Sequence, residues 1–229
     1  MSRIVSLVAV VMLLASCSAE PQPAPQPSQS AVTHDDPLPV IGQERRILAV
    51  GDSLFAGYGL NPGESYPAKL EAALRGRGIN VRITNAGVSG DTSAAGAQRL
   101  GFVLDSQTAP PDLVIIEFGG NDILRALPPE QTRQNLDAML AETRRRGLKV
   151  LVMGMMAPPN LGADYRSKFD PIYPALAKKH GAQLVPFFLS AVMDKPDLVQ
   201  ADHLHPTARG VEEIVAATSA QVAGALGNK

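Results

Sequence analysis

The segment RILAVGDSLFAGYG, residues 46–59, indicates the architecture of the chain more clearly than any other stretch. It opens with a short apolar run, Arg46–Val50, whose length and composition are typical of a strand buried on both faces. Gly51 ends this run, and Ser53 follows almost at once, with a further glycine at position 57. In parallel α/β sheets, functional side chains gather in such turns beyond the carboxyl ends of the strands.

Four further apolar runs predict more strands of the same kind: Val81–Asn85, Leu113–Phe118, Val150–Met153 and Gln183–Pro186. Segments with helical patterning separate them: Glu64–Arg75, Asp91–Leu104, Pro129–Arg146, Asp164–His180 and Pro206–Leu226. This alternation predicts an α/β fold, with an open and mostly parallel five-stranded sheet and a layer of helices on each face. No internal repeat and no second folded domain is evident.

The N-terminus predicts export. A short basic start precedes the apolar run Ile4–Leu14, which is shorter than the roughly 20 residues that a membrane-spanning helix needs. The four residues that end at Cys17 resemble the lipobox of bacterial lipoproteins, and this resemblance implies cleavage before Cys17 and lipid attachment to it. An ordinary secretory peptide with a stray cysteine is the alternative. We therefore predict a signal peptide over residues 1–16, a lipidated and Pro/Gln/Ser-rich tether over 17–42, and the folded domain over 43–229.

Composition excludes several classes of function. With 21 Lys+Arg and 22 Asp+Glu the formal net charge is −1, so the chain lacks the basic surface of a dedicated nucleic-acid binder. Its single cysteine cannot form an intramolecular disulfide, and its four histidines offer little material for a metal centre. No metal and no cofactor is expected.

Ser53 is the candidate nucleophile, because it lies at the carboxyl end of a strand in a small, glycine-rich turn. The surrounding glycines do not have the spacing of a nucleotide-binding loop, and the chain lacks the G-x-S-x-G nucleophile elbow near its middle. A serine hydroxyl needs a neighbouring base to take its proton, so this motif predicts a histidine elsewhere in the chain.

The candidate base lies in the polar segment Asp202–Pro206. A carboxylate at position i can orient the ring of a histidine at i+3, which favours Asp202 as the orienting residue and His205 as the base. His203 is the competing candidate, but it follows Asp202 directly and is badly placed to be held by it. A zinc site made of these three residues is also conceivable, although no further Cys/His cluster completes it.

Two other predicted strand ends offer hydrogen-bond donors for an oxyanion. Gly87 presents a backbone N–H without an obstructing side chain, and Asn121 presents a side-chain amide. Either segment alone could be a plain turn, but both follow strands whose carboxyl ends should meet at the same edge as Ser53.

Taken together, these blocks resemble the GDSL or SGNH hydrolases. The matching residues, in chain order, are Gly51-Asp52-Ser53-Leu54, Gly87, Gly119-Gly120-Asn121-Asp122 and Asp202-x-x-His205-Pro206. The resemblance implies a three-layer, flavodoxin-like α/β/α fold, a Ser53–His205–Asp202 triad, an oxyanion hole from the N–H groups of Ser53 and Gly87 and the Asn121 amide, and no cofactor. His203 departs from the usual small or apolar residue of the last block.

Within that family the chain looks most like the periplasmic acyl-CoA thioesterase, lysophospholipase and arylesterase group. This likeness implies a small-molecule acyl ester or thioester as substrate, and a monomeric enzyme held at the periplasmic side of a membrane by the lipid on Cys17. Residues Met153–Pro159, with aromatic residues that follow, could line an acyl groove, although the helical spacing of Phe169, Ile172 and Leu176 is more typical of core contacts. The alternatives are a carbohydrate O-acetylesterase of the same fold and a catalytically silent envelope-binding lipoprotein.

Overall fold

The computed structural model describes residues 40–227, which belong to a unit spanning Pro39–Lys229. The predicted signal peptide, the lipidation site at Cys17 and most of the predicted tether lie outside the described residues. Among the described residues, no helix is both long and apolar enough to cross a membrane.

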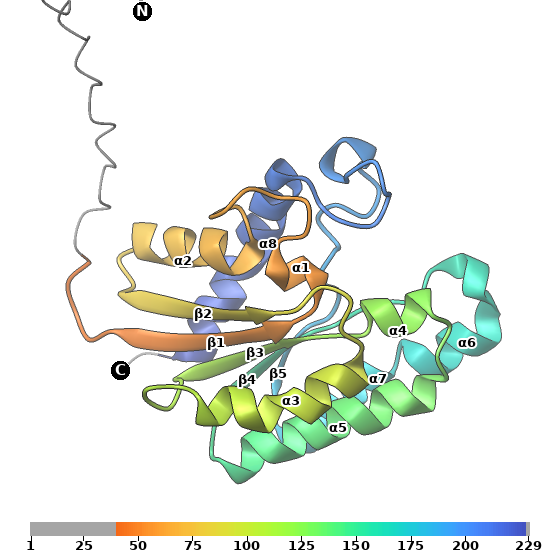
Figure 1. Cartoon of the computed structure of the whole chain (residues 1–229), viewed down its shortest axis with the longest axis horizontal. Coiled ribbons are helices and arrows are strands. Elements are labelled where there is room, and N and C mark those ends of the chain that lie inside the picture. Colours follow the sequence, from red (N-terminus) through yellow and green to blue (C-terminus); the bar gives the residue numbers. More distant parts are fainter. Residues whose placement is uncertain (1–39, 228–229) are drawn as a thin grey trace, which may run out of the picture. The chain divides into compact units, whose positions relative to one another are not determined.

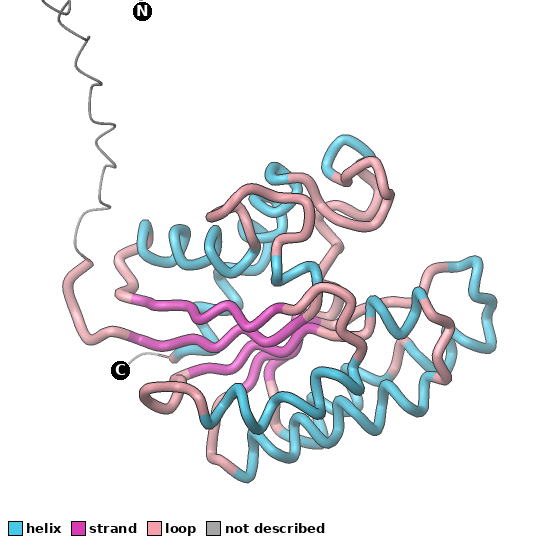
Figure 2. The backbone as a smooth tube through the Cα atoms, in the orientation of Figure 1, coloured by secondary structure: helices cyan, strands magenta, loops and turns pink. Residues whose placement is uncertain are grey.

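Five parallel strands form the single sheet of the described chain (Figures 1 and 2). In chain order they are β1 (Arg45–Gly51), β2 (Val81–Gly87), β3 (Leu113–Glu117), β4 (Val150–Met153) and β5 (Gln183–Val185). Their spatial order is β2-β1-β3-β4-β5, and all neighbouring pairs are parallel. The five predicted strands and the α/β class are confirmed.

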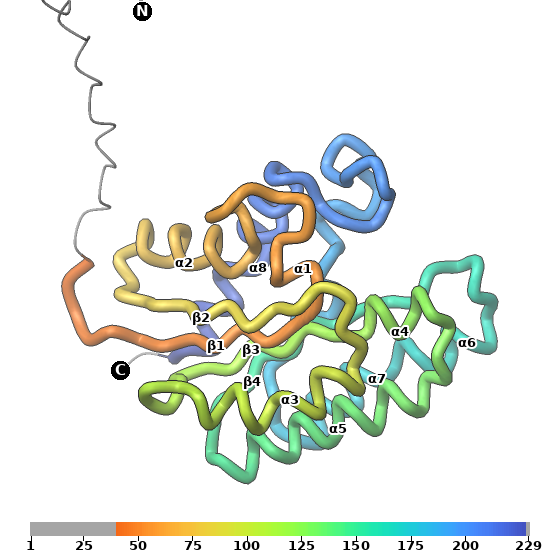
Figure 3. The backbone as a smooth tube through the Cα atoms, in the orientation of Figure 1, coloured from red at the N-terminus to blue at the C-terminus, as the bar shows by residue number. Residues whose placement is uncertain are grey.

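Helices cover both faces of the sheet, which gives the three layers that the resemblance implied (Figure 1). One face carries α2 (Tyr66–Gly76) and α8 (Ala208–Leu226), and the other carries α3 (Ser93–Asp105), α5 (Pro129–Arg145) and α7 (Ile172–His180). The tube in Figure 3 shows that the chain crosses from one face to the other after β2 and returns after β5. Because all five strands are parallel, the loops that follow their carboxyl ends lie at the same end of the sheet.

β3 and β4 are apolar apart from Glu117 at the end of β3, because both faces of these strands are covered. Every residue of β3 and β4 is buried, whereas β2, at the edge of the sheet, is buried fully only at Val81. Phe169 and Ile172 are completely buried in the core, so they do not line a groove. The core role that their helical spacing favoured is confirmed.

Three features of the helices were not predicted. The short helices α1 (Ser53–Ala56) and α4 (Gly120–Leu124) begin directly after strands, in segments that read as turns. The predicted helix Asp164–His180 is two helices, α6 (Gly162–Phe169) and α7, which meet at Pro171. A proline has no N–H to donate to the preceding turn, and its ring clashes with a continuing helix, so the chain breaks there.

Glycines on α3 provide a test of the packing between the helix layer and the sheet. A Cβ at Gly96 would lie 2.4 Å from Cζ of the buried Phe118, whereas a Cβ at Gly101 on the same helix would meet only the end of a flexible arginine at 4.0 Å. We expect Gly96→Ala to lower the free energy of unfolding by about 1–3 kcal/mol through overpacking. Gly101→Ala should raise it by about 0.5–1 kcal/mol through helix propensity. Urea unfolding of both variants checks this, and equal shifts would contradict the packing.

Candidate active site

The nucleophile candidate is held by α1, which lies against the ends of two strands. Ser53 is the first residue of this helix, where backbone N–H groups have no partner within the helix. Asp52 caps the helix by accepting a hydrogen bond from the N–H of Leu54 at 3.0 Å. Gly57 ends it in a left-handed conformation, with φ 83°. These caps fix the direction of the Ser53 side chain.

Ser53, His205 and Asp202 form a continuous chain of hydrogen bonds. Nε2 of His205 lies 2.8 Å from Oγ of Ser53, and Nδ1 lies 2.6 Å from Oδ2 of Asp202. Because an ionised carboxylate only accepts, Nδ1 carries the ring proton and Nε2 is free to accept from the serine hydroxyl. The structure thus brings together the three residues that the sequence singled out.

The loop that carries His205 is fixed by contacts that the sequence did not reveal. The ring of Tyr58, just after α1, lies 4.5 Å from the imidazole ring, centroid to centroid. The side-chain amide of Gln200 donates to the carbonyls of Tyr58 and Pro206, at 2.9 Å each. The N–H of Gln200 donates to the carbonyl of His205 at 2.7 Å. These contacts join the loop before α8 to the loop after β1, far away in the sequence.

The carboxylate of Asp202 is stabilised in its ionised form. Partial desolvation raises the pKa of Asp202, but hydrogen bonds outweigh this effect and hold the pKa at about 2. The donors are the ring of His205 and the N–H groups of His205 and Leu204, both of which lie 3.0 Å from Oδ1. Asp202 therefore keeps its negative charge, and its hold on the imidazole, well below neutral pH.

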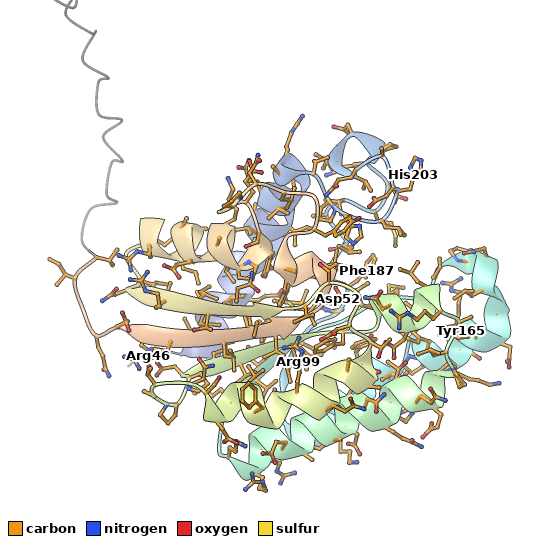
Figure 4. All side chains as sticks on the ribbon, in the orientation of Figure 1. Arg46, Asp52, Arg99, Tyr165, Phe187 and His203 are labelled. Atoms are coloured by element: carbon orange, nitrogen blue, oxygen red, sulfur yellow. The ribbon has the colours of Figure 1, made fainter. Side chains whose placement is uncertain are left out.

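His203 lies apart from this hydrogen-bonded chain. Its backbone has a φ of 60°, which non-glycine residues rarely adopt, and its side chain is exposed. Figure 4 shows it on the outlying loop, whereas Asp52 lies at the carboxyl end of the sheet. Of the two histidines, His205 is the one placed against Ser53 and Asp202. No group of His, Cys, Asp and Glu within residues 40–227 could hold a metal ion.

The oxyanion candidates lie at neighbouring strand ends, and both Asn121 and Gly87 already donate a hydrogen bond. Nδ2 of Asn121, in the first turn of α4, donates to Oδ2 of Asp52 at 3.1 Å, which leaves its second N–H. The N–H of Gly87 donates to Oδ1 of Asn85 at 2.9 Å. Asn85 also donates from Nδ2 to the carbonyl of Phe55 at 2.8 Å, so it ties β2 to α1. The sequence did not predict this role of Asn85.

Two buried carboxyl groups lie beneath Ser53. Asp52 and Glu117 are 1% and 0% exposed, and Oε2 of Glu117 accepts from the N–H of Asp52 at 3.3 Å. Burial raises the pKa of Glu117 well above its usual range, and the negative charge of Asp52 adds to this. Burial also raises the pKa of Asp52, although the hydrogen bonds that it accepts oppose the shift. The apolar pattern of β3 concealed Glu117 from the sequence analysis.

A third buried acid, Asp122, anchors α4 to the helix layer. Its carboxylate accepts from the N–H of Ser93 at 2.8 Å and from Oγ1 of Thr132 at 2.9 Å, and it also bonds the hydroxyl of Ser93. Nearby, Arg99 pairs with Asp91 at 2.7 Å and donates to the carbonyl of Gly51 at 2.9 Å. Both networks fix the backbone around the site rather than reaching the serine.

A mostly apolar pocket with a volume of about 170 Å³ opens beside the serine. Its polar wall contains Ser53, Asn121 and His205. Its apolar wall is made of Leu54, Ile123, Leu124, Met155, Met156, Pro158, Leu189 and Leu204. Of the predicted groove, Met155, Met156 and Pro158 are thus in the lining, whereas Met153 and the aromatic residues proposed with it are not.

A three-layer α/β fold with a serine, a histidine and an aspartate joined by hydrogen bonds at the carboxyl ends of its strands defines a serine hydrolase. The profile of the GDSL-like lipase/acylhydrolase family matches residues 49–212. The chain belongs to this family, and the acyl-hydrolase class and fold predicted from the sequence are confirmed.

Characterised relatives and a solved structure agree with this assignment. The chain is similar to Esterase TesA of Pseudomonas aeruginosa, with 43% identity over 70% of this chain and 79% of the relative. It is 38% identical to thioesterase 1/protease 1/lysophospholipase L1 of Escherichia coli K12, over 70% of this chain and 74% of the relative. AlinE4, an SGNH-hydrolase family esterase, has 66% identity and a TM-score of 0.70, covering 82% of this chain and 100% of its own.

Proposed function

We propose that this enzyme hydrolyses fatty-acyl esters and thioesters through an acyl-enzyme intermediate on Ser53. His205 is the general base, and Asp202 orients its ring. The observation that carries this proposal is the hydrogen-bonded chain from Asp202 through His205 to Ser53, with distances of 2.6 and 2.8 Å. The solved AlinE4 variants add support, because they replace a serine and an aspartate that are as far apart in sequence as Ser53 and Asp202.

In the first half of the reaction, Oγ of Ser53 attacks the carbonyl carbon while its proton passes to Nε2 of His205. The tetrahedral intermediate then collapses, the C–O or C–S bond breaks, and His205 returns the proton to the leaving alcohol or thiol. In the second half, a water molecule gives a proton to His205 and attacks the acyl-enzyme, which releases the carboxylic acid and restores Ser53. The ionised Asp202 stabilises the imidazolium that forms in each half.

The negative charge on the carbonyl oxygen is stabilised by the backbone N–H of Ser53 and the Asn121 amide. The N–H of Gly87 is the third donor of this proposal. Since it already donates to Asn85 at 2.9 Å, it must share this bond or exchange it when the oxyanion forms. The close packing of Gly87 against α1, where a Cβ would lie 2.4 Å from the N atom of Ala56, keeps this backbone next to Ser53.

Variants of the two histidines distinguish this mechanism from the alternative in which His203 is the base. We expect Ser53→Ala and His205→Ala to lower kcat on p-nitrophenyl esters by at least about 10³-fold, since each removes a member of the triad. His203→Ala, the matched control on the same loop, should keep most of the activity. Steady-state kinetics of the three variants measure this. Full activity of Ser53→Ala would reject an acyl-enzyme at this serine, and loss of activity only in His203→Ala would reassign the base.

The acyl chain of the substrate occupies the apolar pocket beside Ser53. Its outer wall includes Leu124 and Met156, which are 57% and 39% exposed in the absence of substrate, so a long acyl chain would cover them. Phe102, on α3, is 77% exposed but does not line the pocket. It therefore offers a matched control for the loss of exposed apolar surface.

We expect the double variant Leu124→Ser/Met156→Ser to lower kcat/KM for decanoyl esters by about tenfold, which corresponds to the loss of about 1.4 kcal/mol of apolar contact. Its rate on acetyl esters should be unchanged, as should both rates in Phe102→Ser. Hydrolysis of p-nitrophenyl esters from acetate to palmitate gives the profile. Equal loss on acetate and decanoate would place the acyl chain elsewhere, and cleavage of acetate alone would favour the carbohydrate O-acetylesterase.

We also propose that the enzyme is exported and anchored as a lipoprotein through Cys17, so that it works as a monomer at the periplasmic side of a membrane. The basic and apolar start of the chain and the lipobox-like residues before Cys17 support this, as does the proline-rich stretch after it.

Cells that produce the full chain should incorporate labelled palmitate into it, and the protein should sediment with the membrane fraction. Cys17→Ser should abolish labelling and release the protein to the soluble fraction, while its esterase activity is retained. Palmitate labelling that persists in Cys17→Ser would rule out this anchor.

A further inference from the structure

Glu117 is a buried acid near Ser53, and the proposed reaction gives it no role. It is the last residue of β3, is fully buried, and lies among apolar side chains of the core. An ionised carboxylate in such a place is strongly destabilised unless several donors surround it. Glu117 has one donor, the N–H of Asp52 at 3.3 Å, and its Oε1 is buried without a donor in the described part of the chain.

Asp52 is better placed to carry the negative charge of the pair. Its carboxylate accepts from the N–H of Leu54 at 3.0 Å and from the amide of Asn121 at 3.1 Å. The carboxyl of Glu117 adjoins Asp52, since its Oε2 accepts from the N–H of Asp52 at 3.3 Å, and two neighbouring carboxyl groups buried this deeply do not both ionise. With fewer donors and deeper burial, Glu117 is the group that holds the proton.

We propose that Glu117 is a positioning residue for the esterase reaction: its protonated carboxyl donates to the Asp52 carboxylate, and Asp52 in turn holds the Asn121 amide toward the oxyanion. The chain of contacts runs from the buried end of β3, through the cap of α1, to the first turn of α4. The role assigned to Asn121 rests on the proposed function. The protonation state of Glu117 does not, and it can be tested separately.

Other ionisable groups around the pair do not offer Glu117 a counter-charge. From α3, the guanidinium of Arg99 is engaged by Asp91 and by the carbonyl of Gly51. From α7, the hydroxyl of Tyr173 donates to the carbonyl of Phe118 at 2.8 Å, and burial raises the pKa of this phenol. From α4, Asp122 bonds Ser93 and Thr132. On the solvent side, His205 faces Asp52 across Ser53.

Two substitutions separate the donor function of Glu117 from its volume. Glu117→Gln keeps an oxygen to accept from the N–H of Asp52 and supplies an N–H₂ group that donates to the Asp52 carboxylate, so it imitates the protonated acid. Glu117→Leu fills a similar volume but cannot donate. Both are made in the full-length chain, alone and combined with Asn121→Ala, and assayed on p-nitrophenyl butyrate with active sites counted by the acyl-enzyme burst.

We expect Glu117→Leu to lower kcat by roughly tenfold with KM unchanged, less than the 10²–10³-fold typical of deleting an oxyanion donor itself. Glu117→Gln should recover most of this loss. In the Asn121→Ala background, Glu117→Leu should have no further effect, because the group through which it acts is gone. The same fold-loss with and without Asn121, or a Glu117→Gln variant as impaired as Glu117→Leu, would overturn the proposed role.

The pH dependence of stability tests the proton on Glu117 without reference to catalysis. A raised pKa in the folded state means that the folded protein keeps a proton which the unfolded chain releases above the ordinary carboxyl pKa. Stability from this group is therefore present at low pH and is lost as the pH rises toward the folded pKa. Glutamine does not titrate, so the Tm of Glu117→Gln minus that of wild type should grow from pH 5 to pH 9.

A difference in Tm that stays constant or shrinks from pH 5 to pH 9 would mean that Glu117 is ionised in the folded protein, and would reject the proposal even if Glu117→Leu failed to fold. If the difference in Tm grows but Ser53→Ala keeps its activity, the proposed function fails while the protonated Glu117 stands. Two results together would support both proposals. The difference in Tm grows with pH, and Glu117→Leu lowers kcat only in chains that retain Asn121.

Discussion

The position of Ser53, the proposed nucleophile, depends on a close approach between α1 and the ends of β1 and β2 that only glycine permits. A Cβ at Gly51 would lie 2.8 Å from the ring of Phe55 and 2.9 Å from Glu117, and a Cβ at Gly87 would lie 2.4 Å from the N atom of Ala56. The two glycines face each other across the parallel pairing of β1 and β2. Any side chain there would push α1, and Ser53 with it, away from the strand ends.

Placing Ser53 is only one half of the geometry that the proposed triad needs, because the proposed base, His205, comes from a loop near the other end of the chain. His205 reaches Ser53 only because Gln200 joins its loop to Tyr58, and because Tyr58 packs its ring on the imidazole. A serine and a histidine so distant in sequence must be held by rigid partners, since a shift of about 1 Å can lower a rate by 10²-fold. The loop that carries the base is thus fixed on the loop that carries the nucleophile.

The sequence was sufficient for those parts of the molecule that depend on residue type and order. Apolar runs without alternation identified the strands, and the spacing of Asp202 and His205 identified the pair that the structure joins to Ser53. The helix break at Pro171 was in principle readable from the same rules. Contacts between distant segments were not readable. Tyr58 reads as one more residue in a glycine-rich turn, and Glu117 reads as the end of a buried strand.

Several acids lie close to the site where the proposed oxyanion forms, and negatively charged carboxylates would repel it. The different surroundings of these acids reduce that repulsion. Two unit charges about 8 Å apart repel by roughly 2 kcal/mol at an effective dielectric constant of about 20. Asp202 lies on the histidine side of the serine, where its charge favours the imidazolium. Asp52 faces the amide of Asn121, whose dipole its charge orients toward the oxyanion. A proton on Glu117 keeps a further negative charge away from the oxyanion and leaves that carboxyl as a donor. The deep burial of Glu117 thus has an electrostatic effect, because it is burial that keeps this carboxyl group neutral.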